Sequence, residues 1–412
     1  MIQEIAKKLH HNQVKVNEWF NQKSTTTPPS FYCSVDIRDS GFKFAPVDCN
    51  LYPAGFNNVC ATDLNAAPNL LKIQMKAVEK ELKLEKVNKV LIISEEHTSN
   101  KFYLENLYFL KQIFLDAGFD TKVGWYELNE NIELSTASGK TIEALPINIR
   151  GGVLAAGNFV PDLILLNNDF SSGYPKKLDP VTQPILPTHQ LGWHSRQKID
   201  HFTHYNQLVN EFSQMIDIDP WYFNIKTEIV RSVNFTENKG VDEVATKVSA
   251  MIEQLKEDYK KHGIDQEPFI FIKSNTGTYG MGIMVVRSAE ELMQMNRRAK
   301  NKMSKGKNRA VIDSVIIQEG IPTVTKVEDY AAEPVIYLFG SELMGGFLRS
   351  NVQKNSEENL NAKGMTFKRL CMSDLRNLNE SDDQEQIPTL EIVYGTIARL
   401  SALANGLELH QK

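Results

Sequence analysis

The segment PFIFIKSNTGTYGMGIMVVR, residues 268–287, constrains the fold most, because it joins two apolar strands through a glycine-rich loop. The first strand ends on Lys273, and Gly277, Gly280 and Gly282 follow before the second strand begins. Glycines let backbone N–H groups turn toward a ligand, and a lysine beside them is a point charge suited to phosphate. Since a Walker loop would open a helix, the pattern predicts a phosphate cradle between two strands; a plain turn is the alternative.

Further along the chain, the strand SVIIQEGIP supports nucleotide binding. It brings the run Gln318-Glu319-Gly320-Ile321 into an extended segment whose backbone can hydrogen-bond an adenine edge. The two segments together favour a nucleotide site on a mostly antiparallel sheet.

The first half of the chain reads differently. A helix over 69–84, the strand 88–94, a helix over 102–117 and the strand 121–127 alternate in the order of a parallel βαβ unit. The segment PDLILLNNDFSSGYP then reads as a buried strand that delivers a polar loop, with Asn168 and Asp169, at its carboxyl end, where ligands gather in such sheets.

Four prolines between residues 175 and 192 indicate a connection between domains. At roughly 150 residues per domain, a chain of 412 residues predicts two or three of them. We expect an α/β domain over 1–185 and an α+β domain over 186–412.

The charge balance argues for small-molecule partners. The 46 basic and 51 acidic side chains give a net charge of −5, which offers no overall attraction to nucleic acid or anionic lipid. The chain has no apolar run of roughly 18 residues and no signal peptide, so we expect no membrane association. The four cysteines form no CxxC pair and indicate neither a zinc site nor a disulfide framework, which fits a reducing cytoplasm. A homo-oligomer remains open.

These motifs resemble the ATP-grasp superfamily, whose members hold ATP between two α+β subdomains and ligate a carboxylate to an amine or thiol. The stretch RQKIDHFTHYNQLV resembles the helix start that gives the superfamily its other ATP-contacting lysine, here Lys198, and GGFLRSNVQKNSEENLNAKG resembles its arginine-bearing loop, here with Arg349. The resemblance implies an N-terminal Rossmann-like pre-ATP-grasp domain and an ATP-grasp domain. It also implies ATP-contacting residues, namely Lys198, Lys273, Ser274, Gly277, Gly280, Gly282, Gln318, Glu319, Gly320 and Ile321.

A closer resemblance covers roughly residues 30–370. The strings FYCSVDIRDSGFKFAPVDCNLYPAGFNNVC, LILLNNDFSSGYP and EPVIYLFGSELMGGF are similar to the bacterial glutamate-cysteine ligase family first recognised in an acidophilic iron oxidiser. This resemblance implies formation of γ-glutamylcysteine from glutamate, cysteine and ATP, the first step of glutathione synthesis. The rival interpretations are another ATP-grasp peptide ligase, such as a glutathione synthetase or a glutamate-adding enzyme, and a non-catalytic ATP-binding regulatory protein.

Residues 31–60 are the expected amino-acid site, because charged and amide side chains crowd into a segment also rich in Phe, Pro and Gly. A guanidinium can fork onto an α-carboxylate while carboxylate and amide oxygens accept from the ammonium. Arg38 is the first choice for a substrate carboxylate and Lys43 the second; surface salt bridges around an irregular loop are the alternative. The substrate candidates are Arg38, Lys43, Asp48, Asn50, Asn57, Asn168 and Asp169, and the catalytic candidates are Lys273, Arg38 and Arg349.

Mg²⁺ is the expected metal, because hard cations that bridge phosphates take oxygen ligands. The superfamily's usual Glu-x-Asn on a final apolar strand is not evident, so Glu333, Glu358 and Asn361 are the nearest candidates, with Asn351 in reserve. A strand-end surface glutamate is the alternative interpretation of Glu333.

Overall fold

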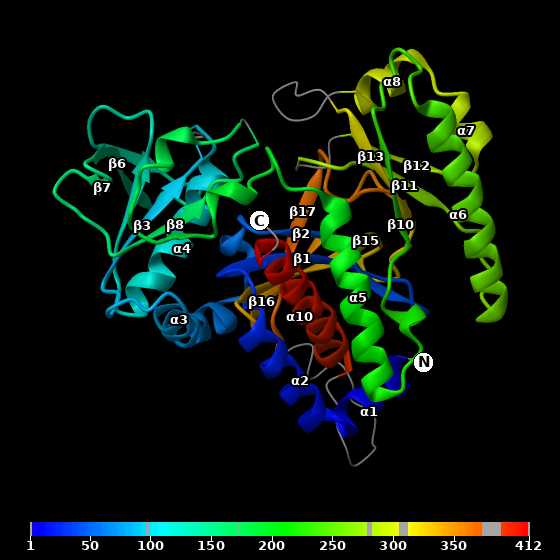
Figure 1. Cartoon of the computed structure of the whole chain (residues 1–412), viewed down its shortest axis with the longest axis horizontal. Coiled ribbons are helices and arrows are strands. Elements are labelled where there is room, and N and C mark those ends of the chain that lie inside the picture. Colours follow the sequence, from blue (N-terminus) through cyan, green and yellow to red (C-terminus); the bar gives the residue numbers. More distant parts are fainter. Residues whose placement is uncertain are drawn as a thin grey trace.

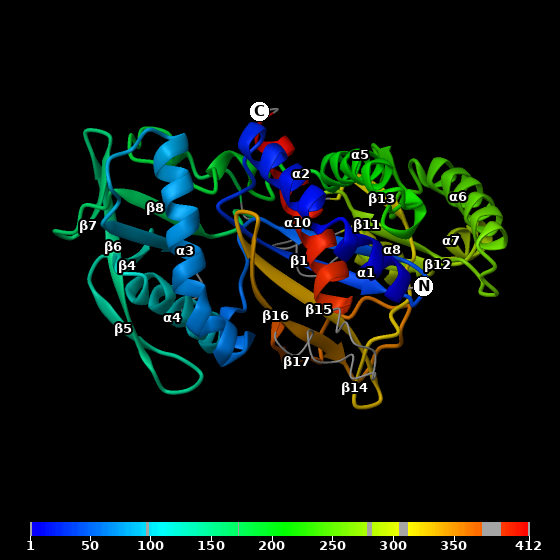
Figure 2. The same ribbon diagram turned by 90° about the horizontal axis from the view of Figure 1, so that it is seen from below.

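The computed structural model describes residues 2–95, 99–171, 173–277, 282–304, 312–372 and 389–410. Within them the protein is a mixed α/β structure with three sheets, which lie side by side in Figure 1 and, turned by 90°, in Figure 2. This agrees with the expected combination of α/β and α+β parts. None of the helices in the described part of the chain is long and apolar enough to cross a membrane.

The first sheet, on the left of Figure 1, is built around parallel strands in the order β5-β6-β4-β3-β8-β9, with β7 paired to β6. The predicted βαβ unit is confirmed, because β3 pairs in parallel with both β4 and β8. Helix α4 packs on strands β4 and β6, and helix α3 packs against α4. The strands are β3 (Lys89–Ser94), β4 (Asp120–Trp125), β5 (Ile132–Ser135), β6 (Thr141–Arg150), β7 (Val153–Ala156), β8 (Leu163–Asn167) and β9 (Ile185–Leu186), and the helices α3 (Ala61–Glu81) and α4 (Lys101–Asp116).

The central sheet joins the two ends of the chain. Its order is β17-β16-β15-β1-β2, all antiparallel, with β14 paired to β15. The strands are β1 (Tyr32–Asp39), β2 (Phe44–Asn50), β14 (Lys326–Val327), β15 (Tyr330–Phe339), β16 (Glu342–Asn351) and β17 (Met365–Leu370). The sheets are therefore not divided at residue 185, since β1 and β2 belong with β15. The division into domains 1–185 and 186–412 stays a prediction.

Strand β1 shows why this sheet can carry a polar site. Its side chains alternate along the pleat, so Cys33, Val35 and Ile37 enter an apolar core while Asp36 and Arg38 point to the opposite face. All of its residues are buried, because both faces of the strand are covered. Asp36 and Arg38 thus lie on a strand rather than in an irregular loop, and Asp48 and Asn50 lie on β2.

The third sheet, at the upper right of Figure 1, carries the predicted phosphate cradle. Its antiparallel order is β10-β13-β11-β12, from β10 (Thr227–Arg231), β11 (Ile270–Ser274), β12 (Ile283–Val286) and β13 (Ser314–Glu319). The two strands around the glycine loop are confirmed as a hairpin, since Lys273 pairs with Ile283. Helix α6 (Val241–Lys261) covers the sheet with a stripe of apolar residues at helical spacing, and α7 (Ala289–Met293) and α8 (Arg297–Met303) follow β12.

Four further helices fill the space beside the central sheet: α1 (Ile2–His11), α2 (Gln13–Thr26), α5 (Lys198–Ile216) and α10 (Thr389–His410). Helix α10 packs against α5, α1, β1 and β2 (Figures 1 and 2). Its side chains are buried along most of its described length, as expected of a helix that is apolar nearly all round. Four short 3₁₀ turns complete the described elements: Phe56–Asn58, Lys176–Leu178, His189–Leu191 and Pro220–Tyr222.

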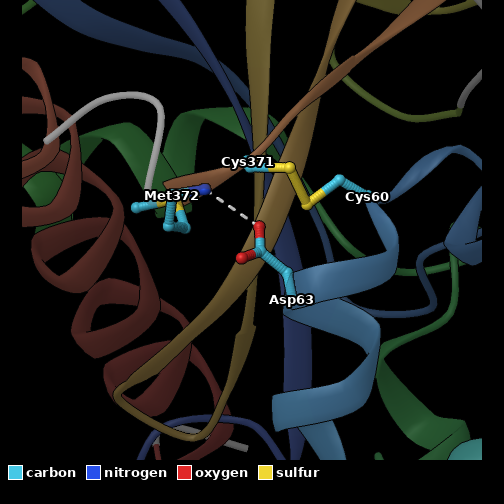
Figure 3. The surroundings of a disulfide bond; sticks show 4 residues. All are labelled: Cys60, Asp63, Cys371 and Met372. Carbon is cyan, nitrogen blue, oxygen red and sulfur yellow. Dashed lines mark hydrogen bonds between the residues drawn. A yellow bond between two sulfur atoms is a disulfide. The ribbon is translucent and has the colours of Figure 1, made fainter. Parts of the chain in front are cut away.

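A disulfide corrects the expectation drawn from cysteine spacing. Cys60, which precedes α3, is bonded to Cys371, which follows β17 (Figure 3). Next to it, the Met372 N–H donates to Asp63 Oδ2 over 3.0 Å. The two cysteines are 311 positions apart, so only the packing of α3 beside β17 brings them together and no spacing rule could indicate the pair. Cys33 and Cys49 are free and buried.

Candidate active site

A small pocket between the central and the four-stranded sheet gathers six of the predicted residues, although these are spread over more than 300 positions. Its volume is about 40 Å³. The predicted residues that line it are Arg38, Asp48, Lys198, Lys273, Glu333 and Asn361, together with Asp36, Val47, Phe271, Ile283 and Asn359.

A larger cavity of about 700 Å³ adjoins this pocket and shares Ile283, Asn359 and Asn361 with it. Strand β12, helix α8 and the segment 354–363 line it, and Gly282 and Glu358 are among its residues. A third cavity, of about 280 Å³ beside α3 and the end of α10, is lined by none of the predicted residues.

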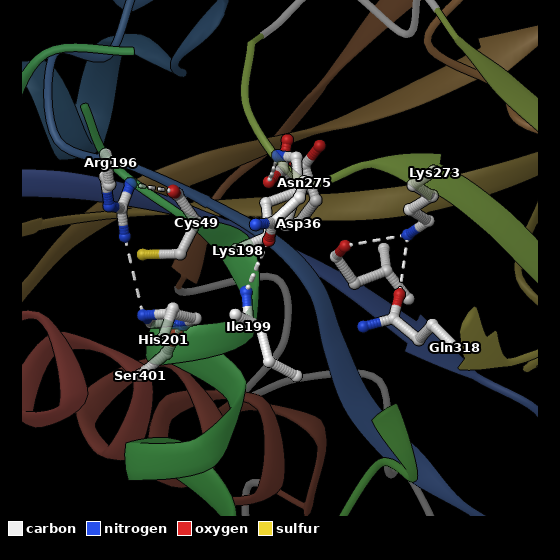
Figure 4. A network of polar contacts seen from close by, with 12 residues as sticks. Asp36, Cys49, Arg196, Lys198, Ile199, His201, Lys273, Asn275, Gln318 and Ser401 are labelled. Carbon is white, nitrogen blue, oxygen red and sulfur yellow. Dashed lines mark hydrogen bonds and ion pairs between the residues drawn. The ribbon is translucent and has the colours of Figure 1, made fainter. Parts of the chain in front are cut away.

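Lys273 stands at the end of β11 and points into the pocket. Its ammonium donates to the Val47 carbonyl over 3.0 Å and to Gln318 Oε1 over 2.7 Å (Figure 4). Burial lowers the pKa of Lys273 to about 7; nearby Asp48 opposes this shift and Lys198 adds to it. A lysine so poorly solvated gains most from an anion placed beside it.

Lys198 is the first residue of α5 and faces the same pocket. Its ammonium donates to Asp48 Oδ1 over 2.5 Å and lies 4.2 Å from the centre of the Trp193 ring. Burial alone would raise the pKa of Asp48, but Lys198 and Lys273 hold it below its usual value. The pocket therefore contains two cations that share one carboxylate.

Asn275 connects the two lysines, and no motif in the sequence marks it as a site residue. It lies two residues after Lys273, and its side-chain oxygen accepts from the Ile199 N–H over 3.1 Å, next to Lys198 (Figure 4). Its backbone carbonyl accepts from the Lys198 N–H over 2.8 Å. Asparagine is a preferred helix cap, but this one caps the first turn of a helix at Ile199, 76 positions earlier in the chain, and local capping rules consider only neighbouring residues.

Two arginines and two carboxylates form a buried cluster beside the lysines. Glu333 and Arg349 lie opposite each other on β15 and β16. Glu333 accepts from Arg38 Nε over 2.5 Å and from Arg349 over 2.9 Å, and Arg349 also donates to Asp36 over 2.6 Å. Burial raises the pKa of Asp36 to about 6, whereas for Glu333 the two guanidinium groups overcome burial and lower the pKa.

Arg38 lines the pocket, but its guanidinium group is hydrogen-bonded to other residues of the protein. Besides Glu333, it donates to the backbone carbonyls of Ser356 and Glu358, each over 2.8 Å. All three of its nitrogens are engaged, so it ties β1 to the segment that carries Asn359 and Asn361.

Lys43, the second choice for a substrate carboxylate, is not brought to the pocket. Its side chain is fully buried, and its ammonium donates to both oxygens of Glu319 over 2.7 and 2.8 Å. It also lies 5.0 Å from the centre of the Trp221 ring. Burial lowers the pKa of Lys43, while Glu319 acts in the opposite direction.

The glycine loop has the backbone that the sequence predicts. Gly277 and Gly282 have positive φ angles of +91° and +61°, and the Ser274 N–H closes the hairpin by donating to the Gly282 carbonyl over 3.0 Å. Gly280 lies outside the described residues.

Two backbone N–H groups of the predicted adenine segment already donate hydrogen bonds to neighbouring backbone carbonyls. The Glu319 N–H donates to the Lys226 backbone carbonyl over 2.9 Å, and the Gly320 N–H donates to the Phe269 backbone carbonyl over 2.8 Å. A side chain at Gly320 would meet the Phe269 ring within 2.3 Å, which explains the glycine. Ile321 is buried behind them.

The other substrate candidates do not line the pocket. Asn50 pairs with Ser34 in the central sheet, and the Asn57 amide donates to Asn58. At the carboxyl end of β8, the Asn168 amide donates to the Ser94 carbonyl over 3.0 Å. Asp169, next to it, accepts from the Ser171 N–H over 2.9 Å.

The three metal candidates are not assembled into one group. Glu333 and Asn361 line the pocket, whereas Glu358 lines the adjoining cavity and accepts from Lys354 over 2.6 Å. Asn351 is buried, and its amide faces backbone carbonyls such as that of Ala362. Among the residues that the structure describes, no three His, Cys, Asp or Glu side chains are placed to hold a metal ion.

The protein thus has a mixed α/β fold with a charged pocket between two antiparallel sheets. The family model for glutamate-cysteine ligases matches residues 6–409, and the chain belongs to that family. The reaction of this enzyme family joins glutamate to cysteine.

One solved structure agrees with this assignment. A candidate gamma-glutamylcysteine synthetase from Methylobacillus flagellatus KT is 37% identical, with a TM-score of 0.88 over 99% of this chain and 96% of that one. The D-alanyl-alanine synthetase A from Vibrio cholerae is more distant, with 13% identity and a TM-score of 0.35 over 76% of this chain and 80% of that one. A comparison with curated proteins found no significant match.

Proposed function

We propose that this chain makes γ-glutamylcysteine from glutamate, cysteine and ATP, and that it does so as an ATP-grasp enzyme with the nucleotide between the central and the four-stranded sheet. The observation that carries the proposal is the pocket in which Lys198 and Lys273 lie beside the arginine–carboxylate cluster. The family membership and the glycine hairpin next to Lys273 support it.

The reaction that we propose has two steps. The γ-carboxylate of glutamate attacks the γ-phosphorus of ATP, which forms an acyl phosphate and releases ADP. The amine of cysteine then attacks the acyl carbon, phosphate leaves, and the nitrogen loses a proton as the amide forms. Lys273 and Lys198 neutralise the phosphate charge, and the buried setting strengthens that effect because little water screens it.

Mg²⁺ fits the chemistry of the oxygen donors at this pocket. Glu333, Asp48 and Asn361 line it, and carboxylate and amide oxygens are ligands that this ion takes. We propose that Glu333 and Asn361 hold Mg²⁺ together with the phosphates, since the described protein groups alone make no complete site. The ion would supply charge neutralisation of the transferred phosphoryl group.

The arginine–carboxylate cluster is our proposal for the amino-acid end of the site. Arg38 and Arg349 are held by Glu333 and Asp36, so a substrate carboxylate that reaches either arginine must compete with these partners. Asn168 and Asp169, at the edge of the parallel sheet, remain candidates for the second amino acid.

An ADP-release assay over a matrix of amino acids, with mass detection of the product, tests the proposed function. ADP should appear only when glutamate and cysteine are both present with Mg-ATP, in equal amount to γ-glutamylcysteine. A product of another composition, or ATP hydrolysis that does not need amino acids, would refute it. Lys256→Met, on the exposed face of α6, is the matched control for the lysine variants below.

A further inference from the structure

A buried ion pair between Arg196 and Glu408 lies next to the start of α5, where Lys198 is. The side chains of Arg196 and Glu408 are each only 3% exposed, and neither lines the pocket. Arg196 donates to Glu408 through Nε over 2.8 Å and through a terminal nitrogen over 2.9 Å. Burial alone would raise the pKa of Glu408, but Arg196 and His201 hold it at about 2, so the pair is fully charged near neutral pH.

The same guanidinium reaches the strand that supports Lys198. The other terminal nitrogen of Arg196 donates to the Cys49 carbonyl over 2.6 Å (Figure 4). The residue before Cys49 is Asp48, whose carboxylate accepts from the Lys198 ammonium. Arg196 therefore connects Glu408 of α10 to the end of β2, where the carboxylate partner of Lys198 is attached.

Arg196 is also close to Lys198 in the chain and shares an aromatic contact with it. It is two residues before Lys198, at the entry to α5, and both cations lie over the Trp193 ring, at 5.1 Å and 4.2 Å from its centre. The ring of His201, one turn into α5, is hydrogen-bonded to the Glu408 carboxylate over 2.7 Å and to the Ser401 hydroxyl over 3.0 Å. Helix α10 thus holds the first turn of α5 as well as the end of β2.

We propose that Glu408 and Arg196 are positioning residues for Lys198, so that the last turns of α10 set the affinity for the nucleotide. Charge removed at Glu408 leaves a buried guanidinium without its partner, and Arg196 then loses the geometry that fixes Asp48 and Lys198. The inference rests on the proposed role of Lys198 at the ATP phosphates.

The test is a double-mutant cycle read by equilibrium ATP affinity. Glu408→Gln keeps the shape and removes the charge, and it should weaken ATP binding by about tenfold in the wild-type background. In the Lys198→Met background the same change should have almost no effect on ATP affinity, because the ammonium group that Glu408 helps to position is already absent. Thr396→Ala is the matched control on α10, since the Thr396 hydroxyl donates to the Ile392 carbonyl of the same helix and the change leaves the pair of Glu408 and Arg196 intact; it should bind ATP as the wild type does.

Equal weakening of ATP binding by Glu408→Gln in both backgrounds would overturn the proposal and leave Glu408 a purely structural residue. So would equal increases in KM for ATP, glutamate and cysteine. If Glu408→Gln does not fold, as judged by its melting curve, Arg196→Lys takes its place, because it keeps the charge and loses the three-way contact. A wild-type protein with no ADP release in the amino-acid matrix would instead refute the proposed function.

Discussion

Cys60→Ser opens a covalent loop of 311 residues and should lower the stability of the protein. A crosslink restricts the unfolded chain, and for a loop of this length the chain-entropy relation gives about 5.7 kcal/mol at 25 °C, which we take as an upper limit. An unfolding entropy of about 2.1 cal/mol/K per residue, over 412 residues, converts this limit into a melting temperature lower by at most about 7 °C.

Differential scanning fluorimetry with and without dithiothreitol measures the effect. Reduction should lower the melting temperature of the wild type toward that of Cys60→Ser, and it should not change the variant. Cys33→Ser is the matched control, because it removes a buried free thiol and should keep the response to dithiothreitol.

Thiol titration of the denatured, unreduced protein gives an independent reading. Two thiols should react in the wild type, those of Cys33 and Cys49. Four reactive thiols, together with a melting temperature that dithiothreitol does not change, would show that Cys60 and Cys371 are not bonded and that the reasoning from the loop is wrong.

Four further predictions concern the pocket. Lys273→Met should lower kcat/KM by about 10²- to 10³-fold, while Lys256→Met should not; retention of a third of the activity would remove Lys273 from the phosphate site. Because the pKa of Lys273 is about 7 and bound phosphate should raise it, ATP binding at about pH 8 should take up a proton, as measured by calorimetry in two buffers, and Lys273→Met should abolish the uptake. Arg38→Lys should weaken the binding of one amino acid by about 1.5 to 3 kcal/mol and leave the affinity for ATP unchanged. Equal losses of affinity for all substrates, together with a lower melting temperature, would mean that Arg38 only stabilises the segment around Ser356. Asn275→Ala should lower stability by about 1 kcal/mol through the lost helix cap and weaken ATP more than either amino acid, and Asn275→Asp should restore both.

Local patterns in the sequence predicted several of the helices and strands. The alternation of strand and helix between residues 69 and 127 predicted the parallel βαβ unit, because periodicity and strand length are properties of neighbouring residues. The glycine hairpin after Lys273 was predicted for the same reason. The composition of 31–60 marked a polar segment, but not the fact that it forms two strands of the central sheet.

The partners of the charged side chains could not be predicted in this way. Arg38 was expected to face a substrate, yet its fork is occupied by Glu333 and two backbone carbonyls on the segment 356–358. Lys43 lies in the connection between β1 and β2 and is buried against Glu319 instead. A lysine or arginine has the same appearance in a sequence whether its charge meets solvent, substrate or a buried carboxylate, because that depends on residues hundreds of positions away.

The sequence by itself determined the parallel βαβ unit, the glycine hairpin and the resemblance that the family model confirms over residues 6–409. Only the tertiary structure decided that β1 pairs with β15, that Cys60 meets Cys371, and that Asn275 caps the helix that begins at Lys198. The physical reason is that these contacts join segments 76 to 311 positions apart. No local propensity selects such partners, and packing of the whole chain brings them within bonding distance.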